Sequence, residues 1–344
     1  MAAVAAIAAV ATRRSARRHA SHPVPSGALD SPNSETGPLP RTARGKGRPA
    51  QETRLEILQL TISGIALGCI YALIALGFVL IYKATETVNF AQGEFMMLGA
   101  FAGVVLTMLG LPLVLAVPLT VAGMAGFGML VERLAIRPIL GQPQFTVVML
   151  TIGMGYVMRG LITMVPGIGA GTHTLPVPYQ GMVWRTGALV LSVEQVAVIG
   201  VTAALCVVLY LVFRYSRIGV AMQASSQNQL AAYYMGIPVR RLNGLVWGLS
   251  ASVAAIAGLL LAPITFVHAS MGMLGLKAFP AAVVGGFGSL PGAIVGGLVI
   301  GVVESLAGFY LPEGFKDVAA YVVVLIMLVV KPNGLFGENL RKKV

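Results

Sequence analysis

The chain has 344 residues, of which 57% are hydrophobic and only 10% are charged, and its formal net charge is +12. A soluble domain carries about 25% charged residues, so this composition excludes a soluble protein and indicates a membrane protein. The basic excess does not indicate a nucleic-acid-binding face, because residues 1–54 hold nine of the 24 Lys and Arg residues and the others mostly flank apolar runs.

The first segment, residues 1–54, is rich in Arg, Pro, Gly and Ser and is predicted to be a disordered basic extension. Its apolar start, Met1–Ala11, precedes the arginines, which is the reverse of the order in a secretory signal. Three interpretations stay open: a disordered extension, a start site assigned too far upstream, or an organellar transit peptide. Whether the mature protein contains the segment stays open with them.

Four long runs carry no charged residue: Ile57–Tyr82, Phe95–Val131, Leu242–Leu276 and Ala278–Val303. Since a helix needs about 20 apolar residues to cross a hydrocarbon core, several of these runs are membrane spans. The alternation of a membrane β-barrel is absent. Residues 55–337 are therefore predicted to form an all-α polytopic bundle of about eight or nine transmembrane helices with broken or re-entrant segments. The predicted spans are 57–82, 93–110, 111–131, 144–165, 192–213, 243–267, 272–288, 290–311 and 318–330.

The basic residues between the spans predict the orientation, because Lys and Arg accumulate in cytoplasmic loops. The loops that this rule places in the cytoplasm contain Arg133 and Arg137, Arg214 and Arg217, Arg240 and Arg241, and the basic C-terminal tail 338–344. Nine spans then place the N-terminus outside, where its basic extension contravenes the same rule. Either the mature protein lacks the extension or one span is miscounted. The Gly- and Pro-rich loop 166–191 is predicted to be external and to cap the outer mouth.

Glycines recur four residues apart, which indicates closely packed helices in lipid. These pairs are Gly64 and Gly68, Gly99 and Gly103, Gly292 and Gly296, and Gly297 and Gly301. The segment Gly285–Gly292 is different, since its four glycines and one proline predict a broken helix. Broken backbone at membrane depth is tolerated only against protein or beside a water-filled path.

Three polar side chains, Asn89, Gln92 and Glu94, stand next to a long uncharged run. Glu94 has two interpretations: an intramembrane functional carboxylate, or a first-turn residue that the helix dipole favours. Glu304 is a more isolated carboxylate. Arg159 either pairs with Glu304 or reaches the membrane interface along its own helix, and we expect the second.

Residues 219–236 are predicted to form one amphipathic helix on the cytoplasmic face, with an apolar stripe that includes Val220, Leu230, Tyr233 and Tyr234. A helix lying on lipid usually carries Lys or Arg on its polar face, and this segment has none. A groove on a partner protein suits it better.

The sequence contains none of the common nucleotide-binding or catalytic motifs: it has no phosphate-binding GxxxxGK[ST] motif, no HExxH motif and no GxSxG motif. Cys69 and Cys206 lie in apolar runs without a metal-ligand spacing. We therefore expect no catalytic residue, metal or cofactor. If transport is driven by ATP, the ATPase is a separate chain.

Four ordered motifs together resemble the branched-chain amino-acid ABC transporter permeases of the LivH type. They are Gly68–Gly77, Asn89–Glu94 followed by Met97–Ala100, Arg217–Gly236, and Gly285–Gly292. The resemblance covers roughly residues 57–337. Gln92 departs from the family, which often has His at this position. Ser225–Gln229 also departs, because the family usually has an acidic residue there.

The resemblance implies a permease subunit, itself not an enzyme, of a type II-like importer in the bacterial inner membrane. Its implied partners are two cytoplasmic ABC ATPases, a second permease subunit that is expected to be a different companion chain, a periplasmic solute-binding protein and the lipid bilayer, with no nucleic acid. The implied path candidates are Asn89, Gln92, Glu94, Gly286, Gly288, Ser289 and Glu304. The implied ATPase-coupling candidates are Arg217, Gly219, Gln227, Tyr233, Tyr234 and Gly236.

Branched-chain amino acids are the expected solutes, and urea or short amides are the alternative that related permeases suggest. A different class of protein also stays open, a secondary transporter that works alone with Glu94 and Glu304 as ion sites. A membrane enzyme is disfavoured because no nucleophile–base or metal constellation is present.

Overall fold

A computed structural model describes residues 50–186, 189–312 and 314–337. The chain divides into two units, Met1–Ile57 and Leu58–Val344, and the second unit is the subject below. Most of the predicted extension and the whole predicted tail 338–344 lie outside the described residues. The last five residues of the extension, 50–54, belong to the first helix rather than to a disordered segment.

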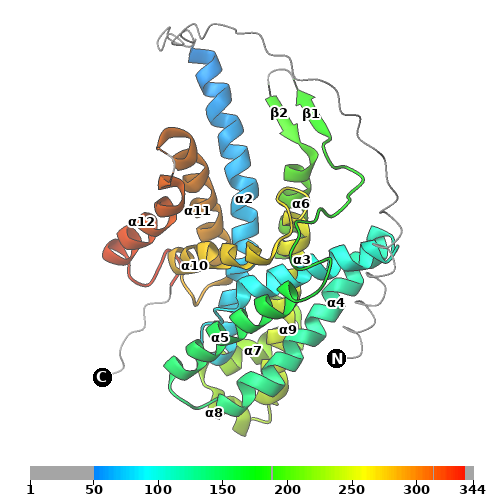
Figure 1. The fold of residues 1–344 in the computed structure, drawn as a ribbon. Coiled ribbons are helices and arrows are strands. Elements are labelled where there is room, and N and C mark those ends of the chain that lie inside the picture. Colours follow the sequence, from blue (N-terminus) through cyan, green and yellow to red (C-terminus); the bar gives the residue numbers. More distant parts are fainter. Residues whose placement is uncertain (1–49, 187–188, 313, 338–344) are drawn as a thin grey trace, which may run out of the picture. The chain divides into compact units, whose positions relative to one another are not determined.

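Every predicted span coincides with a helix of the described residues, which confirms the all-α polytopic fold (Figure 1). Six helices are long and apolar enough to cross a membrane, while α3, α10 and α12 are shorter. The helices are α2 (Ala50–Thr85), α3 (Gln92–Met108), α4 (Leu113–Val131), α5 (Gln144–Thr163), α6 (Val193–Tyr215), α9 (Val239–Leu261), α10 (Leu274–Gly285), α11 (Leu290–Tyr310) and α12 (Phe315–Val330). Short helical turns, η1 (Glu132–Ile136), η2 (Arg137–Ile139) and η3 (Ala269–Met273), extend α4 and precede α10.

The predicted single helix over 219–236 is wrong, because two helices stand there: α7 (Arg217–Gln227) and α8 (Gln229–Tyr234). Asn228 separates them in an extended conformation, and its side chain caps α8 by accepting a 2.9 Å hydrogen bond from the amide of Ala231. Asn is among the best N-cap residues and a poor residue for a helix interior, so the break follows from its side chain.

The loop predicted to be external contains a small antiparallel hairpin, β1 (Val183–Thr186) and β2 (Leu189–Ser192), in register from Val183–Ser192 to Thr186–Leu189. An isolated bridge between His173 and Val267 ties the same loop to the segment that follows α9. The all-α prediction did not include this hairpin, because the loop lacks a clear alternation of polar and apolar residues.

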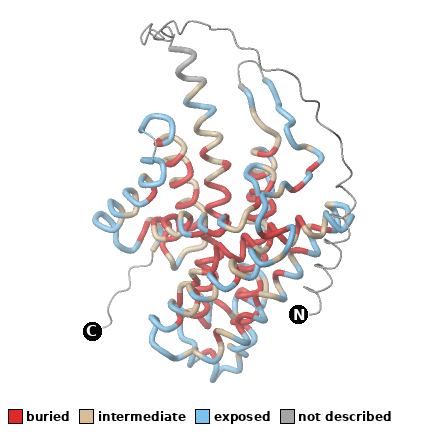
Figure 2. The backbone as a smooth tube through the Cα atoms, viewed as in Figure 1, coloured by how far each residue is buried: buried red, intermediate tan, exposed pale blue. Residues whose placement is uncertain are grey.

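Two helices form the centre of the domain, α2 and α9, whose apolar stretches are mostly buried (Figure 2). Helices α4, α5 and α6 keep a large exposed apolar surface, and Ala320 is the one residue of α12 classed as buried. In a membrane, such faces meet lipid or another apolar helix rather than water. The burial pattern therefore separates a core from a lipid- or partner-facing layer.

Glycines set the closest helix contacts. A Cβ atom built at Gly68 of α2 would lie 2.8 Å from the Cα of Leu298 in α11, and one at Gly301 would lie 2.3 Å from the Cα of Gly68. Helices α3 and α9 meet in the same way, since a Cβ at Gly99 would lie 2.4 Å from the Cα of Ala255. The close packing predicted from the glycine spacing is confirmed.

A leucine at Gly68 should destabilise the domain, because its side chain has to enter space held by the backbone of α11. We expect Gly68→Leu to lower the free energy of unfolding by about 3 kcal/mol, measured as a fall of the melting temperature in mild detergent. Gly126→Leu is the matched control, since no atom lies within 4 Å of a Cβ at Gly126. Equal melting temperatures for the two variants would contradict the packing argument.

Candidate functional site

Two buried polar clusters and one cavity hold the candidate side chains of the membrane part. The first cluster lies where the chain turns from α2 into α3. Asn89, Gln92 and Ser250 are each at most 1% exposed. Asn89 accepts a 3.1 Å hydrogen bond from the amide of Ala91, and its side-chain nitrogen donates to Gln92 Oε1 at 3.3 Å. The side chain of Asn89 thus shapes the turn that starts α3.

Gln92 links three helices at this point. Its Nε2 donates to the carbonyl of Ser250 in α9 at 3.3 Å, and Ser250 Oγ lies 3.0 Å from both Gln92 Oε1 and the carbonyl of Gly77 in α2. A Cβ at Gly77 would lie 1.8 Å from Gln92 Nε2, so the amide occupies space that only glycine leaves open. Asn89 and Gln92 are therefore brought together, in a closed network.

Glu94 is the third residue of α3 and forms an ion pair with Arg159 of α5. The predicted pairing of Arg159 with Glu304 is wrong, because its partner is Glu94; its reach to the membrane interface stays a prediction. Two glycines explain the pairing, because Gly272 and Gly155 leave room beside the carboxylate; a Cβ at Gly272 would lie 2.8 Å from Glu94 Oε1. Both interpretations of Glu94 have support: it stands in the first turn and is also a nearly buried, paired carboxylate.

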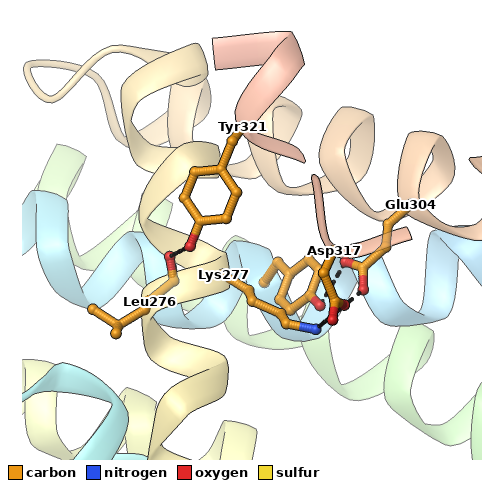
Figure 3. A network of polar contacts seen from close by, with 6 residues as sticks. Leu276, Lys277, Glu304, Asp317 and Tyr321 are labelled. Carbon is orange, nitrogen blue, oxygen red and sulfur yellow. Dashed lines mark hydrogen bonds and ion pairs between the residues drawn. The ribbon is translucent and has the colours of Figure 1, made fainter. Parts of the chain in front are cut away.

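The second cluster surrounds Glu304 of α11, which is 2% exposed (Figure 3). Tyr71 of α2 donates a 2.7 Å hydrogen bond to Glu304 Oε2, and Lys277 Nζ of α10 lies 3.9 Å from Glu304 Oε1. Lys277 also forms an ion pair with the exposed Asp317 of α12. The network therefore joins four helices and leads from a buried carboxylate to the surface of the domain.

The predicted helix break at Gly285–Gly292 is present. α10 ends at Gly285, Gly286 has a φ of +97°, and Ser289 caps α11 by accepting a 3.1 Å hydrogen bond from the amide of Gly292. Segment 333–336 lies against the break, with the amide of Leu335 donating to the carbonyl of Val284 at 2.8 Å. The break is thus supported by protein, as exposed backbone groups at this depth require.

Gly288 and Ser289 line a cavity of about 530 Å³ between α2, α6, α7 and the break. Asn89, Gln92, Glu94, Gly286 and Glu304 are not among its lining residues. The structure therefore distributes the predicted path candidates over several places: the two clusters, the Glu94–Arg159 pair, this cavity, and the helix break that holds Gly286.

Helices α7 and α8 mark one end of the domain, called the α7–α8 end below. Gln229 of α8 donates a 2.9 Å hydrogen bond to the carbonyl of Ala84 at the end of α2, and Arg137 donates to the carbonyl of Arg240 at 3.3 Å. Several basic residues that the orientation rule groups on one side are thus on one end of the domain.

The coupling candidates differ in their exposure. Gly219 is buried at the turn from α6 into α7, where a Cβ would lie 2.4 Å from the carbonyl of Phe213, whereas Arg217 and Gln227 are exposed. Tyr233 and Tyr234 are 66% and 77% exposed, with ring centres 6.0 Å apart. Gly236 ends the segment with a φ of +85°. An exposed aromatic surface at a helix end is typical of a partner-binding site.

Sequence reasoning missed Tyr71, Ser250, Lys277 and the buried Glu132, which Arg137 holds through hydrogen bonds of 2.7 and 3.2 Å. Lys277 had a signal, since it is the one charged residue between positions 242 and 303. Ser250 and Tyr71 had none, because hydroxyl groups are common in apolar spans.

No group of three or more His, Cys, Asp or Glu side chains that could hold a metal ion lies among the residues that the structure describes.

Comparison with known proteins agrees with the geometry. Residues 60–331 match the family model described as branched-chain amino acid transport system / permease component. The high-affinity branched-chain amino acid transport system permease protein LivH of Salmonella typhimurium is 32% identical over 309 residues, covering 85% of this chain and 99% of that protein. LivH of Escherichia coli is 31% identical over the same shares, and BraD of Pseudomonas aeruginosa is 30% identical over 83% and 98%.

A solved structure, PsaBC from Streptococcus pneumoniae in complex with Fab, aligns with 81% of this chain and 93% of its own, with a TM-score of 0.45 and 16% identity.

Removal of one partner from the Glu94–Arg159 pair should cost more than removal of both. We expect Arg159→Met to lower the free energy of unfolding by about 3 kcal/mol, because a carboxylate is left buried without its cation. The double variant Glu94→Gln/Arg159→Met should recover much of that loss. Melting temperatures of the two single variants and the double variant form a mutant cycle. Strictly additive losses would show that the two side chains do not interact.

Proposed function

The chain belongs to the family of branched-chain amino acid transport system permeases, and from this premise we propose that it forms a translocation path and docks an ABC ATPase through α7 and α8. The relatives are named as permease subunits, so this chain is a transport subunit and a multi-pass membrane protein. We place it in the bacterial inner membrane, with the α7–α8 end in the cytoplasm.

The observation that supports docking is the exposed surface of α7 and α8. Tyr233, Tyr234 and Met235 are exposed, although the same segment is fixed to the domain by the Gln229–Ala84 hydrogen bond and by the buried Met222 and Ala232. A surface that is rigidly attached and apolar can transmit a displacement of the partner to α6 and α9. Since the chain has no phosphate-binding motif, the nucleotide site belongs to that partner.

The path itself is assigned to the buried clusters and the cavity. Gln92, Ser250 and Gly77 keep three helices in contact without a charge, so a small rearrangement exchanges hydrogen bonds rather than exposing an ion. The apolar outer faces of α4, α5 and α6 suit a second permease subunit and lipid. Affinity for the solute is expected mainly in a separate solute-binding protein.

Branched-chain amino acids are the proposed solutes because relatives at about 30% identity carry that solute in their names. Urea and short amides remain the alternative. A stand-alone secondary transporter would use Glu94 and Glu304, but both carboxylates already have partners, Arg159 for the first and Tyr71 and Lys277 for the second. An ion site on either would have to break a buried pair in each cycle.

Loss of the two aromatic rings on α8 should uncouple the subunits. We expect Tyr233→Ala/Tyr234→Ala to weaken retention of the ATPase and to lower ATP-dependent uptake by about tenfold, while the melting temperature stays unchanged. Trp184→Ala is the matched control, since Trp184 has the same 66% exposure as Tyr233 but stands on the β-hairpin. Full coupling in the double variant would remove the proposed role of α8.

The choice of solute should be visible in competition. In cells that depend on this chain for leucine uptake, an excess of valine or isoleucine should suppress uptake of labelled leucine, and an excess of urea or acetamide should leave it unchanged. The reason is that all three solutes share a branched apolar side chain of similar size and the same amino-acid end groups. Suppression by urea or acetamide alone would support the alternative solute class.

A further inference from the structure

The cavity at the α7–α8 end is lined largely by apolar side chains, together with two cations. Its apolar lining comes from α2, α6, α11 and the C-terminal segment, and includes Leu76, Leu209, Ile294 and Phe336. Its charged lining residues are Lys83 and Arg214, and none of the described residues that line it is acidic. Such a surface matches a molecule with one anionic end and a long apolar part.

The two cations stand at the depth where spans end. Lys83 is two residues before the end of the span Glu56–Thr85, and Arg214 is one residue before the end of the span Val193–Tyr215. Polar headgroups of a bilayer lie at this level, directly beyond the hydrocarbon core.

The side chain of Arg214 is already oriented. Its Nη1 donates a 2.7 Å hydrogen bond to the hydroxyl of Tyr210, and its guanidinium carbon lies 5.7 Å from the centre of that ring. Within the described part of the chain, none of the ion pairs involves Lys83 or Arg214. Both cations are thus available to an external anion.

We propose that this cavity binds an anionic phospholipid of the leaflet at the α7–α8 end. The phosphate lies between Lys83 and Arg214, and an acyl chain follows Leu76, Leu209 and Ile294. Basic pockets between transmembrane helices are known binding sites for anionic headgroups. The rule that cations flank spans explains why both residues are at this end, but it does not explain why cations from two different helices face one apolar-walled cavity.

A lipid in this place would touch the proposed coupling element. Gln223 of α7 lines the same cavity, and so do Gly288 and Ser289 of the helix break. The lipid therefore keeps α6, α7 and the helix break at fixed distances from one another. The proposal does not depend on the identity of the solute or on ATPase docking.

The test measures lipid binding to the full chain, purified in mild detergent together with any subunits that accompany it. Native mass spectrometry during titration with dioleoyl-phosphatidylglycerol should show one tightly held lipid. Lys83→Gln and Arg214→Gln should each weaken its binding roughly fivefold, and the double variant should weaken it roughly 25-fold. Phosphatidylcholine, glycerol 3-phosphate and leucine are titrated in parallel.

The control is Arg133→Gln/Arg241→Gln, which removes two exposed cations from the same end of the domain without touching the cavity. Its phosphatidylglycerol affinity should stay within about twofold of the wild type. Melting temperatures of both double variants check that each is folded.

Four results would overturn the proposal. The first is unchanged binding in Lys83→Gln/Arg214→Gln, and the second is equal binding of phosphatidylcholine. The third is binding of glycerol 3-phosphate as tightly as the lipid, which would mean a site for free anions. The fourth is displacement of the lipid by leucine, which would assign the cavity to the solute path.

Discussion

Contact between helix backbones, made possible by glycine, is the constraint on which the rest of this domain depends. Lipid offers no hydrophobic drive for helices to associate, so dispersion contacts and hydrogen bonds have to hold them together. Gly68 and Gly301 bring α2 against α11, and Gly99 brings α3 against α9. Because these contacts leave no space for side chains, they set the depth of α2 relative to α11 and of α3 relative to α9. These depths in turn decide which polar groups can meet.

The buried polar groups then satisfy one another through hydrogen bonds and ion pairs. Gln92 reaches Ser250 and the carbonyl of Gly77 because Gly77 leaves room for its amide. Glu94 reaches Arg159 because two further glycines stand beside the carboxylate. An unpaired polar group at this depth would cost several kcal/mol, so each cluster is stable only as a set. Networks of this kind have few alternative arrangements, so they change between discrete states rather than deform gradually.

Much of the fold could be predicted from the sequence. The long apolar runs located the spans, although several of them contain a charged residue, such as Arg159 or Glu194. The glycine spacing indicated the close helix contacts, and Gly285–Gly292 indicated the break. The prediction failed where a partner comes from a distant part of the chain. Arg159 was expected to pair with Glu304 or to reach the interface, yet its partner is Glu94, 65 positions earlier in the chain. The prediction of one helix over 219–236 failed for a local reason. The capping side chain of Asn228 outweighed a continuous amphipathic pattern. Lys277 could be recognised in the sequence as an isolated charge. Its pairing with Glu304 and Asp317 could not be predicted, because it depends on the tertiary packing of α10, α11 and α12.

The measurement that tests the central claim most directly is uptake of labelled leucine into proteoliposomes that contain the purified complex of this chain with its ATPase. The solute-binding protein is supplied on one side of the bilayer and ATP on the other. With a binding protein outside and ATP at the ATPase, the account predicts accumulation that stops when ATP is omitted and continues when a protonophore collapses the ion gradient. Accumulation by this chain without any ATPase, driven by a proton gradient and abolished by the protonophore, would contradict the account and make Glu94 and Glu304 ion-coupling residues.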